Sequence, residues 1–226
     1  MQRVVTPELL DSDAGTPREI EDSFTDLRMI NHRFGGIRTL TSLLHEVARR
    51  TGLNKLRYLD VAGGAGDVAS LVGESLAESG IQLETVVLDR AASHLNGKHP
   101  GICGDALALP CADNSFDVVG STLFIHHLEP EEFVNSAREA LRVARYGMVV
   151  NDLIRNSVHY WLAVAGRALY RSRLTWHDAP VSVQRAYTMP EMRAMLLRSG
   201  AAAVEINAHY LFRMGAIAWK QKPTTT

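Results

Sequence analysis

The chain has 226 residues, 46% of them hydrophobic, and a formal net charge of −1 at pH 7. This length suits one well-buried domain and leaves too little for two full ones. It contains neither a run of 18 apolar residues nor a signal-peptide pattern, so we expect a cytoplasmic protein without a membrane span. Near-neutral charge, without a basic stripe carrying interleaved aromatics, disfavours nucleic acid as a partner.

Charge is distributed unevenly along the chain. Residues 1–150 carry 14 Lys and Arg against 21 Asp and Glu, whereas residues 151–226 carry 10 against 4. The basic C-terminal third predicts one of two arrangements: an acidic substrate group bound there, or pairing with acidic residues of the N-terminal half. Cys103 and Cys111 form no CxxC pair and no metal-ligand cluster with the nine histidines. We therefore expect reduced thiols and no metal.

The N-terminal part combines a polar segment with two helical patterns. Residues 1–18 contain few apolar positions and are expected to be mobile or loosely docked. Residues 19–34 place Phe24, Leu27, Ile30 and Phe34 at helical spacing, and two glycines then end the helix. Residues 39–50 form a second amphipathic pattern.

A strand, a glycine-rich turn and a helix follow at residues 57–76. The apolar run 58–61 predicts a short buried strand, and Ala62-Gly63-Gly64-Ala65-Gly66 lets backbone N–H groups approach a ligand closely. A helical pattern begins after Asp67. This order is typical of a nucleotide-binding βα unit.

Two carboxylates argue against a dinucleotide at this turn. Gly64-x-Gly66-x-x-Ala69 fits the loose dinucleotide pattern, but Asp60 and Asp67 lie where a pyrophosphate would bind. Like charges a few ångströms apart would cost several kcal/mol. A ligand with a sulfonium and an ammonium reverses the sign of this interaction, which favours S-adenosylmethionine.

The next apolar run, 81–88, ends in Asp89. This carboxylate lies about 20 residues beyond the glycines, where such a group can accept hydrogen bonds from both ribose hydroxyls. The alternative is an ordinary loop aspartate.

Further elements alternate along the rest of the chain. Glu129-Pro130-Glu131 starts a helix, 146–150 is a strand, and 157–170 is helical. Residues 171–187 form a loop-like cap segment. Thr188-x-x-Glu191 is a capping box, and 203–208 and 212–219 are closing strands. This pattern predicts an α/β fold, an open sheet with helices on both faces that binds ligands beyond the carboxyl ends of its strands.

Several motifs in order resemble class I S-adenosylmethionine-dependent methyltransferases. The closest resemblance is to the branch of ubiquinone/menaquinone C-methyltransferases and small-molecule O-methyltransferases. It covers residues 57 to about 152, with one departure, because Ala62 stands where the family usually has glycine. The matching pieces are Leu59-Asp60-Val61-Ala62-Gly63-Gly64-Ala65-Gly66, Val87-Leu88-Asp89, Gly104-Asp105-Ala106, Ser115-Phe116-Asp117-Val118-Val119 and Phe124-Ile125-His126-His127-Leu128.

The resemblance implies a doubly wound Rossmann-like sheet of about seven strands, the last antiparallel, with a helical cap. It divides the chain into a lid segment, 1–36, and a methyltransferase domain, 37–226, whose substrate cap lies at about 153–187. Asp89 would hold the ribose, Asp105 the adenine amino group, and Arg33 the cofactor carboxylate. The full cofactor-binding set expected is Arg33, Asp60, Ala62, Gly63, Gly64, Asp89, Arg90, Asp105, Ala106, Thr122 and His127.

Candidate catalytic and acceptor-binding residues come from the ends of later strands and from the cap. A general base helps when the acceptor is a phenol, whose pKa near 10 leaves it protonated at neutral pH. His126 and His177 are the candidate catalytic residues, although His126 also suits a structural or positioning role. The expected acceptor-binding set is Phe34, His126, Asp152, Arg155, His159, Trp161, Trp176, Arg185 and Tyr187.

The sequence thus predicts a monomeric or homodimeric enzyme that uses S-adenosylmethionine, with S-adenosylhomocysteine as product. The expected acceptor is an oxygen or carbon of a phenolic, quinone-like or polyketide-type compound. A nicotinamide oxidoreductase is disfavoured by Asp60 and by the lack of Tyr-x-x-x-Lys. A nucleic-acid methyltransferase is disfavoured by charge and by the lack of an Asn/Asp-Pro-Pro-Tyr motif. A protein that binds the cofactor without transferring a methyl group remains open as an alternative.

Overall fold

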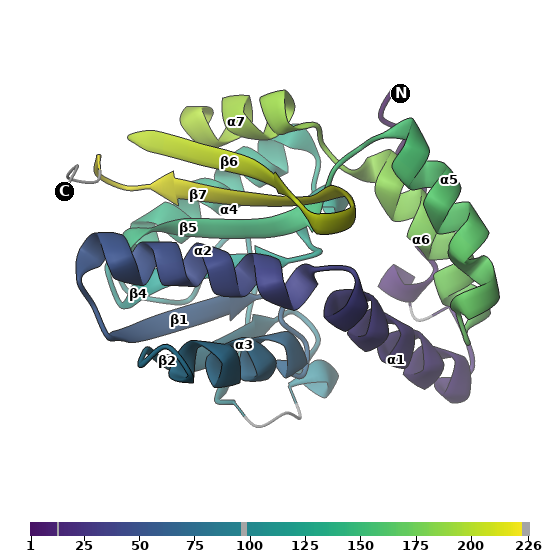
Figure 1. The fold of residues 1–226 in the computed structure, drawn as a ribbon, viewed down its shortest axis with the longest axis horizontal. Helices are drawn as coiled ribbons and strands as arrows, with labels where there is room; N and C mark the ends of the chain where they lie inside the picture. Colours follow the sequence, from purple (N-terminus) through teal and green to yellow (C-terminus); the bar gives the residue numbers. More distant parts are fainter. Residues whose placement is uncertain (13, 96–98, 223–226) are drawn as a thin grey trace.

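A single seven-stranded sheet organises the molecule (Figure 1). The computed structural model describes residues 1–12, 14–95 and 99–222. The strand order is β3-β2-β1-β4-β5-β7-β6; β1 to β5 run parallel, and β7 is antiparallel to both of its neighbours. This confirms the predicted fold class. The strands are β1 (Lys55–Val61), β2 (Gln82–Asp89), β3 (Gly101–Cys103), β4 (Phe116–Thr122), β5 (Ala144–Leu153), β6 (Ala203–His209) and β7 (Arg213–Trp219).

Helices cover both faces of the sheet. Side chains of α2 and α3 pack with Leu56, Tyr58 and Val149 on one face, and those of α4 and α7 pack with Leu59 and Val150 on the other. Alternate strand residues therefore enter opposite cores. The helices are α1 (Pro17–Arg33), α2 (Gly36–Thr51), α3 (Asp67–Ala77), α4 (Pro130–Val143), α5 (Ser157–Ala165), α6 (Arg173–Arg185) and α7 (Met189–Arg198). Short 3₁₀ turns lie at η1 (Leu10–Ser12), η2 (Ala92–His94), η3 (Ile125–His127), η4 (Gly166–Leu169) and η5 (Tyr210–Phe212).

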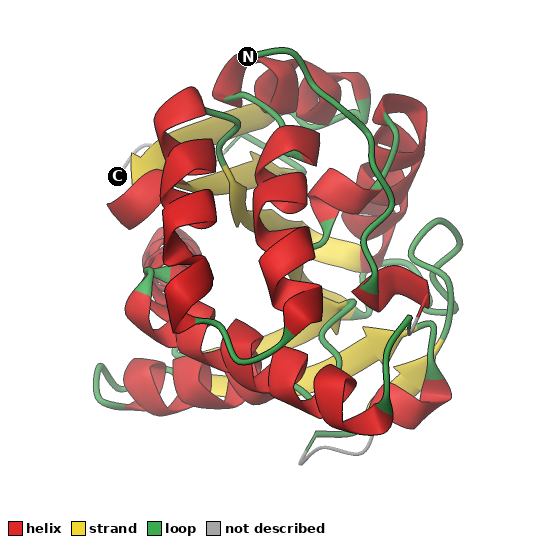
Figure 2. Cartoon of the chain, turned by 90° about the vertical axis from the view of Figure 1, so that its right-hand side faces the viewer, coloured by secondary structure: helices red, strands yellow, loops and turns green. Residues whose placement is uncertain are grey.

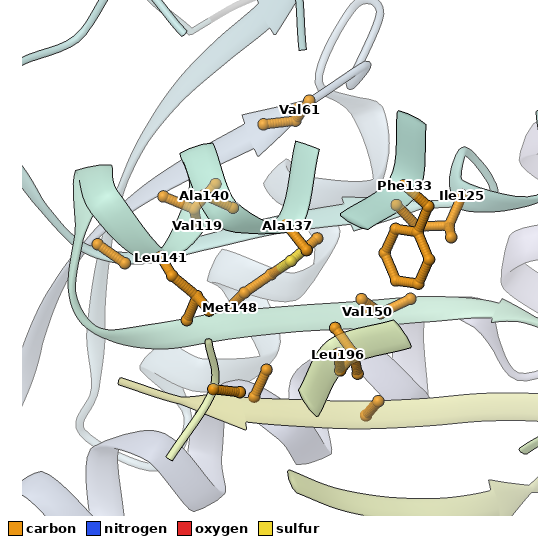
Figure 3. Close-up of a cluster of buried hydrophobic side chains, with 14 of the residues drawn as sticks. Val61, Val119, Ile125, Phe133, Ala137, Ala140, Leu141, Met148, Val150 and Leu196 are labelled. Carbon is orange, nitrogen blue, oxygen red and sulfur yellow. The ribbon is translucent and has the colours of Figure 1, made fainter. Parts of the chain in front are cut away.

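The core beneath α4 and α7 fixes the strand ends that carry the site. Phe133 of α4 is fully buried, and Figure 3 shows its ring beside Ile125, the first residue of η3, and above Val150 of β5. Burying side chains of this size contributes about 1.5–3 kcal/mol each. The turn that follows β4 is thereby fastened to the sheet. Within the described residues, no helix is both long and apolar enough to cross a membrane.

A helical cap stands beside the carboxyl edge, the edge of the sheet at which β1, β2, β4 and β5 end (Figures 1 and 2). It consists of α5 and α6, which pack against each other, with α1 packed against α6. The expected loop at 171–187 is wrong, because α6 occupies most of it. Ser172 caps its N-terminus, and the helix continues past Pro180 because one face, including Leu174 and Val183, is buried.

The N-terminal segment, residues 1–12, is docked rather than loose. The Val4 N–H donates to the carbonyl of Gln184 (3.1 Å), and the Leu9 and Leu10 N–H groups donate to the Asp178 carboxylate (2.8 and 3.0 Å). The docking could not be predicted from hydrophobic patterning, because the segment binds through hydrogen bonds to polar groups on α6.

The basic C-terminal third pairs with acidic residues of the N-terminal half. Arg173 contacts Glu19, Arg185 lies 3.2 Å from Asp11, and Arg198 lies 2.7 Å from Glu131. Of the two predicted arrangements, intramolecular pairing accounts for these three arginines.

Backbone strain concentrates at the carboxyl edge. Residues other than glycine rarely adopt positive φ, at a cost of about 1–2 kcal/mol each. In the described part of the chain, four of the five such residues lie where β1 or β4 ends or where β7 begins. They are Ala62 (57°), Leu123 (55°), Leu211 (49°) and Phe212 (60°), while Asn114 (55°) lies elsewhere.

Replacing Ala62 by glycine should remove this local strain. We expect Ala62→Gly to raise the free energy of unfolding by about 0.5–1 kcal/mol, since relief at positive φ exceeds the added freedom of the unfolded chain. Ala65, in the same turn, has no positive φ. Ala65→Gly should therefore lower the unfolding free energy by about 0.4–1 kcal/mol. Urea denaturation measures both changes, and equal destabilisation by the two variants would contradict the assignment of strain to Ala62.

Candidate active site

The polar groups of the candidate site lie at the carboxyl edge, on both sides of the point where strand order reverses. β1 pairs with β2 on one side and with β4 on the other, so the segments after these strands lie next to one another. In open α/β sheets this reversal is where ligands bind. The structure brings Asp60, Gly64, Asp89 and Thr122 to this edge, as predicted.

The turn after β1 depends on close packing over a buried carboxylate. Asp60 is 2% exposed and accepts a hydrogen bond from the Tyr58 hydroxyl (3.1 Å). A Cβ on Gly63 would lie 2.5 Å from Asp60 Oδ2, whereas one on Gly64 would meet nothing within 4 Å. Burial raises the pKa of Asp60 to about 7; the Tyr58 hydroxyl opposes the rise, and the Asp89 charge adds to it. Asp60 is therefore a carboxylate that a neighbouring cation would stabilise.

Asp89 connects the end of β2 to the glycine turn. Its carboxylate accepts hydrogen bonds from the Gly64 N–H (3.2 Å) and the Ala91 N–H (2.9 Å), and its side chain is 14% exposed. His94 Nδ1 lies 3.4 Å from Asp89, and Phe24 of α1 packs edge-on against His94. Helix α1 thus reaches over the residues that surround Asp89.

The loop after β3 supplies two further expected groups beside Asp89. The Gly104 N–H donates to the Asp89 carbonyl (3.0 Å), which holds this loop against β2. Asp105 is exposed and accepts from the Leu107 N–H (2.9 Å), and Ala106 is half-buried. Arg90 is exposed. These residues lie on the β2 and β3 side of the glycine turn.

Arg28, rather than Arg33, is the α1 arginine that pairs with the helix after the glycine turn. Arg33 is exposed in the last turn of α1, while Arg28 lies 3.2 Å from Asp67 in the first turn of α3. The sequence did show opposite charges at the two positions, since Arg28 lies in the first predicted helix and Asp67 directly follows the glycines. Spacing alone offered no means of choosing between the two arginines.

His126 lies at the other side of the reversal, between two carboxylates. Its Nδ1 is 2.7 Å from Asp152 Oδ1, and its Nε2 is 3.6 Å from Glu8 Oε1. Its backbone N–H also donates to Asp152 (3.1 Å). Burial opposes charging of the ring, but Asp152 and Glu8 outweigh it and raise the pKa of His126 to about 10.

His127, expected near the cofactor, belongs to the same cluster. Its Nδ1 lies 3.0 Å from Asp11 Oδ1, and its Nε2 lies 3.9 Å from Glu8 Oε2. The rings of His126 and His127 are 4.3 Å apart between centroids. Glu8 and Asp11 were missed, since nothing local indicates that the N-terminal segment approaches residues more than 110 positions away.

The second histidine candidate, His177, connects to this cluster through α6. Its Nδ1 lies 2.8 Å from the carboxylate of its neighbour Asp178. Ser182, one turn further along, donates to Glu8 Oε1 (2.9 Å). Arg185 donates to Asp11 (3.2 Å) and to the His127 carbonyl (2.9 Å). The structure therefore joins His126, Asp152, His177 and Arg185 in one network.

The remaining acceptor candidates are dispersed. Arg155 is fully engaged with the Met1 and Ala186 carbonyls and Glu191, and the Tyr187 hydroxyl donates to the Leu128 carbonyl. Trp161 and Trp176 are 66% and 47% exposed. His159 stacks on Phe212 and bonds the Ile154 carbonyl, and Phe34 ends α1. Arg155 and Tyr187 thus have structural partners.

The chain resembles known methyltransferases in sequence. Residues 59–149 match the family described as a methyltransferase domain. A ubiquinone/menaquinone biosynthesis C-methyltransferase (UbiE) of Dinoroseobacter shibae is 39% identical over 103 residues, 40% of this chain and 39% of the relative. Its counterpart in Ruegeria sp. is 33% identical over 114 residues, 42% and 44% of the two chains. The chain therefore spans about two fifths of the length of the curated relatives it matches.

Solved structures share the fold over a greater length. The plantazolicin methyltransferase BpumL, in complex with a triazolic desmethylPZN analog and SAH, matches with a TM-score of 0.69 and 13% identity over 95% of both chains. The CMeT domain of the citrinin polyketide synthase matches with a TM-score of 0.55 and 14% identity, over 75% of this chain and 47% of that one. Residues 59–149 thus match a methyltransferase domain, and the chain as a whole shares its fold with solved S-adenosylmethionine-dependent methyltransferases.

Proposed function

We propose that this chain transfers a methyl group from S-adenosylmethionine to an oxygen or carbon of a small acceptor, of phenolic, quinone-like or polyketide type. The cofactor supplies an electrophilic methyl carbon on a sulfonium. The main contribution of the protein is proximity, worth up to about 7–11 kcal/mol when the reacting atoms are well aligned.

The observation that carries this proposal is the arrangement of Asp60, Gly64 and Asp89 at the strand reversal. Open space beside Gly64 leaves room for a ligand, and the buried Asp60 favours a cation. Asp89 offers a carboxylate next to the same turn, where it would hold the ribose hydroxyls. The residues present thus fit a cationic nucleoside and oppose a pyrophosphate.

The acceptor would lie between the ends of β4 and β5 and the cap. His126 stays the first candidate catalytic residue, because it is buried directly after β4 and is oriented by Asp152; since its raised pKa keeps it protonated at neutral pH, it would position the acceptor rather than remove its proton. We keep residues 1–36 as the lid and 153–187 as the cap, since α1, α5 and α6 pack together beside this edge. The names of the curated relatives support transfer to a carbon atom of the acceptor. Transfer to an oxygen atom would follow if the acceptor is the phenol expected from the sequence.

Removing the Asp89 carboxylate should weaken cofactor binding. A charge-assisted hydrogen bond contributes about 1.5–3 kcal/mol, so Asp89→Ala should reduce affinity about tenfold or more. Titration calorimetry with S-adenosylmethionine measures the change. Asp113→Ala is the control, because that side chain is 69% exposed and pairs with Arg142 away from the glycine turn. Unchanged affinity in Asp89→Ala would exclude Asp89 from the ribose site.

Cofactor affinity should rise with pH through the titration of Asp60. Its pKa of about 7 means that the carboxyl is largely protonated at pH 6, and a bound cation favours the ionised form. Affinity should therefore increase by about tenfold between pH 6 and 8. At pH 8 Asp60 is already ionised, whereas at pH 6 it must first lose a proton before the cation binds.

Two comparisons isolate this effect. Asp60→Asn keeps an acceptor for the Tyr58 hydroxyl and should flatten the pH dependence, and S-adenosylhomocysteine, which lacks the sulfonium, should show a weaker dependence. A dependence that persists in Asp60→Asn would assign the titration to another group.

A further inference from the structure

Three potential metal ligands meet beside the candidate acceptor site. Glu8 comes from the N-terminal segment, and His126 and His127 come from η3. One ligand atom from each residue lies within 4.8 Å of the others, and their side chains are 8%, 3% and 23% exposed. Two imidazoles and one carboxylate form a ligand set used for zinc and other first-row divalent metals.

Both imidazole rings are oriented as metal ligands usually are. His126 Nδ1 bonds Asp152 (2.7 Å) and His127 Nδ1 bonds Asp11 (3.0 Å), so each ring directs Nε2 towards Glu8. A carboxylate on the outer nitrogen fixes the tautomer and strengthens the ligand nitrogen in metal sites. Two consecutive histidines held in this way point to one shared ligand between the rings and Glu8.

The separations between the inner atoms suit a metal ion better than a proton. His126 Nε2 lies 3.6 Å from Glu8 Oε1, and His127 Nε2 lies 3.9 Å from Glu8 Oε2. An N–H···O hydrogen bond spans about 2.7–3.2 Å. Two ligand atoms bound tetrahedrally at about 2.1 Å from zinc lie roughly 3.4 Å apart, so both histidine–carboxylate separations are close to the length that a shared zinc requires.

The charge of the cluster is also suitable. Glu8, Asp11 and Asp152 contribute three carboxylates around the two rings, and Arg185 supplies one cation, 3.2 Å from Asp11 and 3.8 Å from Glu8. Once a metal has displaced the proton that His126 holds at neutral pH, the five groups and the arginine carry two negative charges in excess. A divalent cation balances them.

We propose that Glu8, His126 and His127 bind a first-row divalent metal, with zinc as the representative ion and the remaining coordination position open to water or an acceptor oxygen. Magnesium is a poor ligand match because it prefers oxygen atoms and octahedral geometry. Metal binding itself needs no S-adenosylmethionine, although the site shares His126 with the proposed acceptor site and in that respect rests on the proposed function. Because Glu8 lies on the N-terminal segment, the metal would fasten residues 1–12 to η3.

Zinc binding to the chelator-stripped chain, without S-adenosylmethionine, tests the proposal. Competition with a chromophoric chelator should give one zinc per chain with micromolar or tighter affinity, unaffected by millimolar magnesium. Glu8→Gln and His127→Gln should each weaken binding by about tenfold or more. His45→Gln is the matched control, since His45 is exposed on α2, and it should bind as the unmodified chain does.

X-ray absorption at the zinc edge should show two imidazole nitrogens. Glu8→Gln decides the matter if His127→Gln fails to fold, because glutamine can still accept the Ser182 hydrogen bond. Binding of less than one zinc, or equal affinity in Glu8→Gln and the unmodified chain, would overturn the site. Failure of methyl transfer in both the metal-free and the zinc-loaded chain, with zinc binding intact, would count against the proposed function alone.

Discussion

The architecture of the candidate site depends on the contact between Gly63 and the buried carboxylate of Asp60. Any side chain at Gly63 would overlap Asp60 Oδ2, which a Cβ would approach to 2.5 Å. With glycine there, β1 ends directly above its own carboxylate, and the turn bends towards Asp89 on the neighbouring strand. This close packing brings carboxylates from two strands to one backbone loop.

A second group of charged side chains, around His126 and Asp152, lies on the other side of the strand reversal. Its carboxylates have side-chain partners of opposite charge. Asp60 and Asp89 have backbone and hydroxyl partners, so part of their charge remains for a ligand. Asp152 is buried against His126 and depends on that ring. The two groups at this edge of the sheet therefore differ, because the first has mainly backbone and hydroxyl partners and the second pairs carboxylates with histidine and arginine side chains.

Sequence patterns predicted the elements and motifs formed by neighbouring residues, and they missed the contacts between segments that are distant in sequence. Asp60, Gly64 and Asp89 were placed correctly at one edge because parallel strands bring their ends together. The resemblance implied a helical cap, but His177 was placed in a loop within it, because the face that α6 buries, including Leu174 and Val183, becomes apparent only in the folded chain. The contact between Glu8 and His126 could not be predicted from the sequence. Periodicity and motif spacing carry no information about a contact between two segments so far apart along the chain.

The docking of the N-terminal segment also has a consequence for synthesis. Glu8 is hydrogen-bonded to Ser182, 174 residues later in the chain. At roughly 5–20 residues per second, a ribosome takes roughly 10–35 s to make that intervening length. Until α6 has been made, Glu8 has no Ser182 to accept a hydrogen bond from. The cluster around His126 is therefore among the last parts of the newly made chain to be completed.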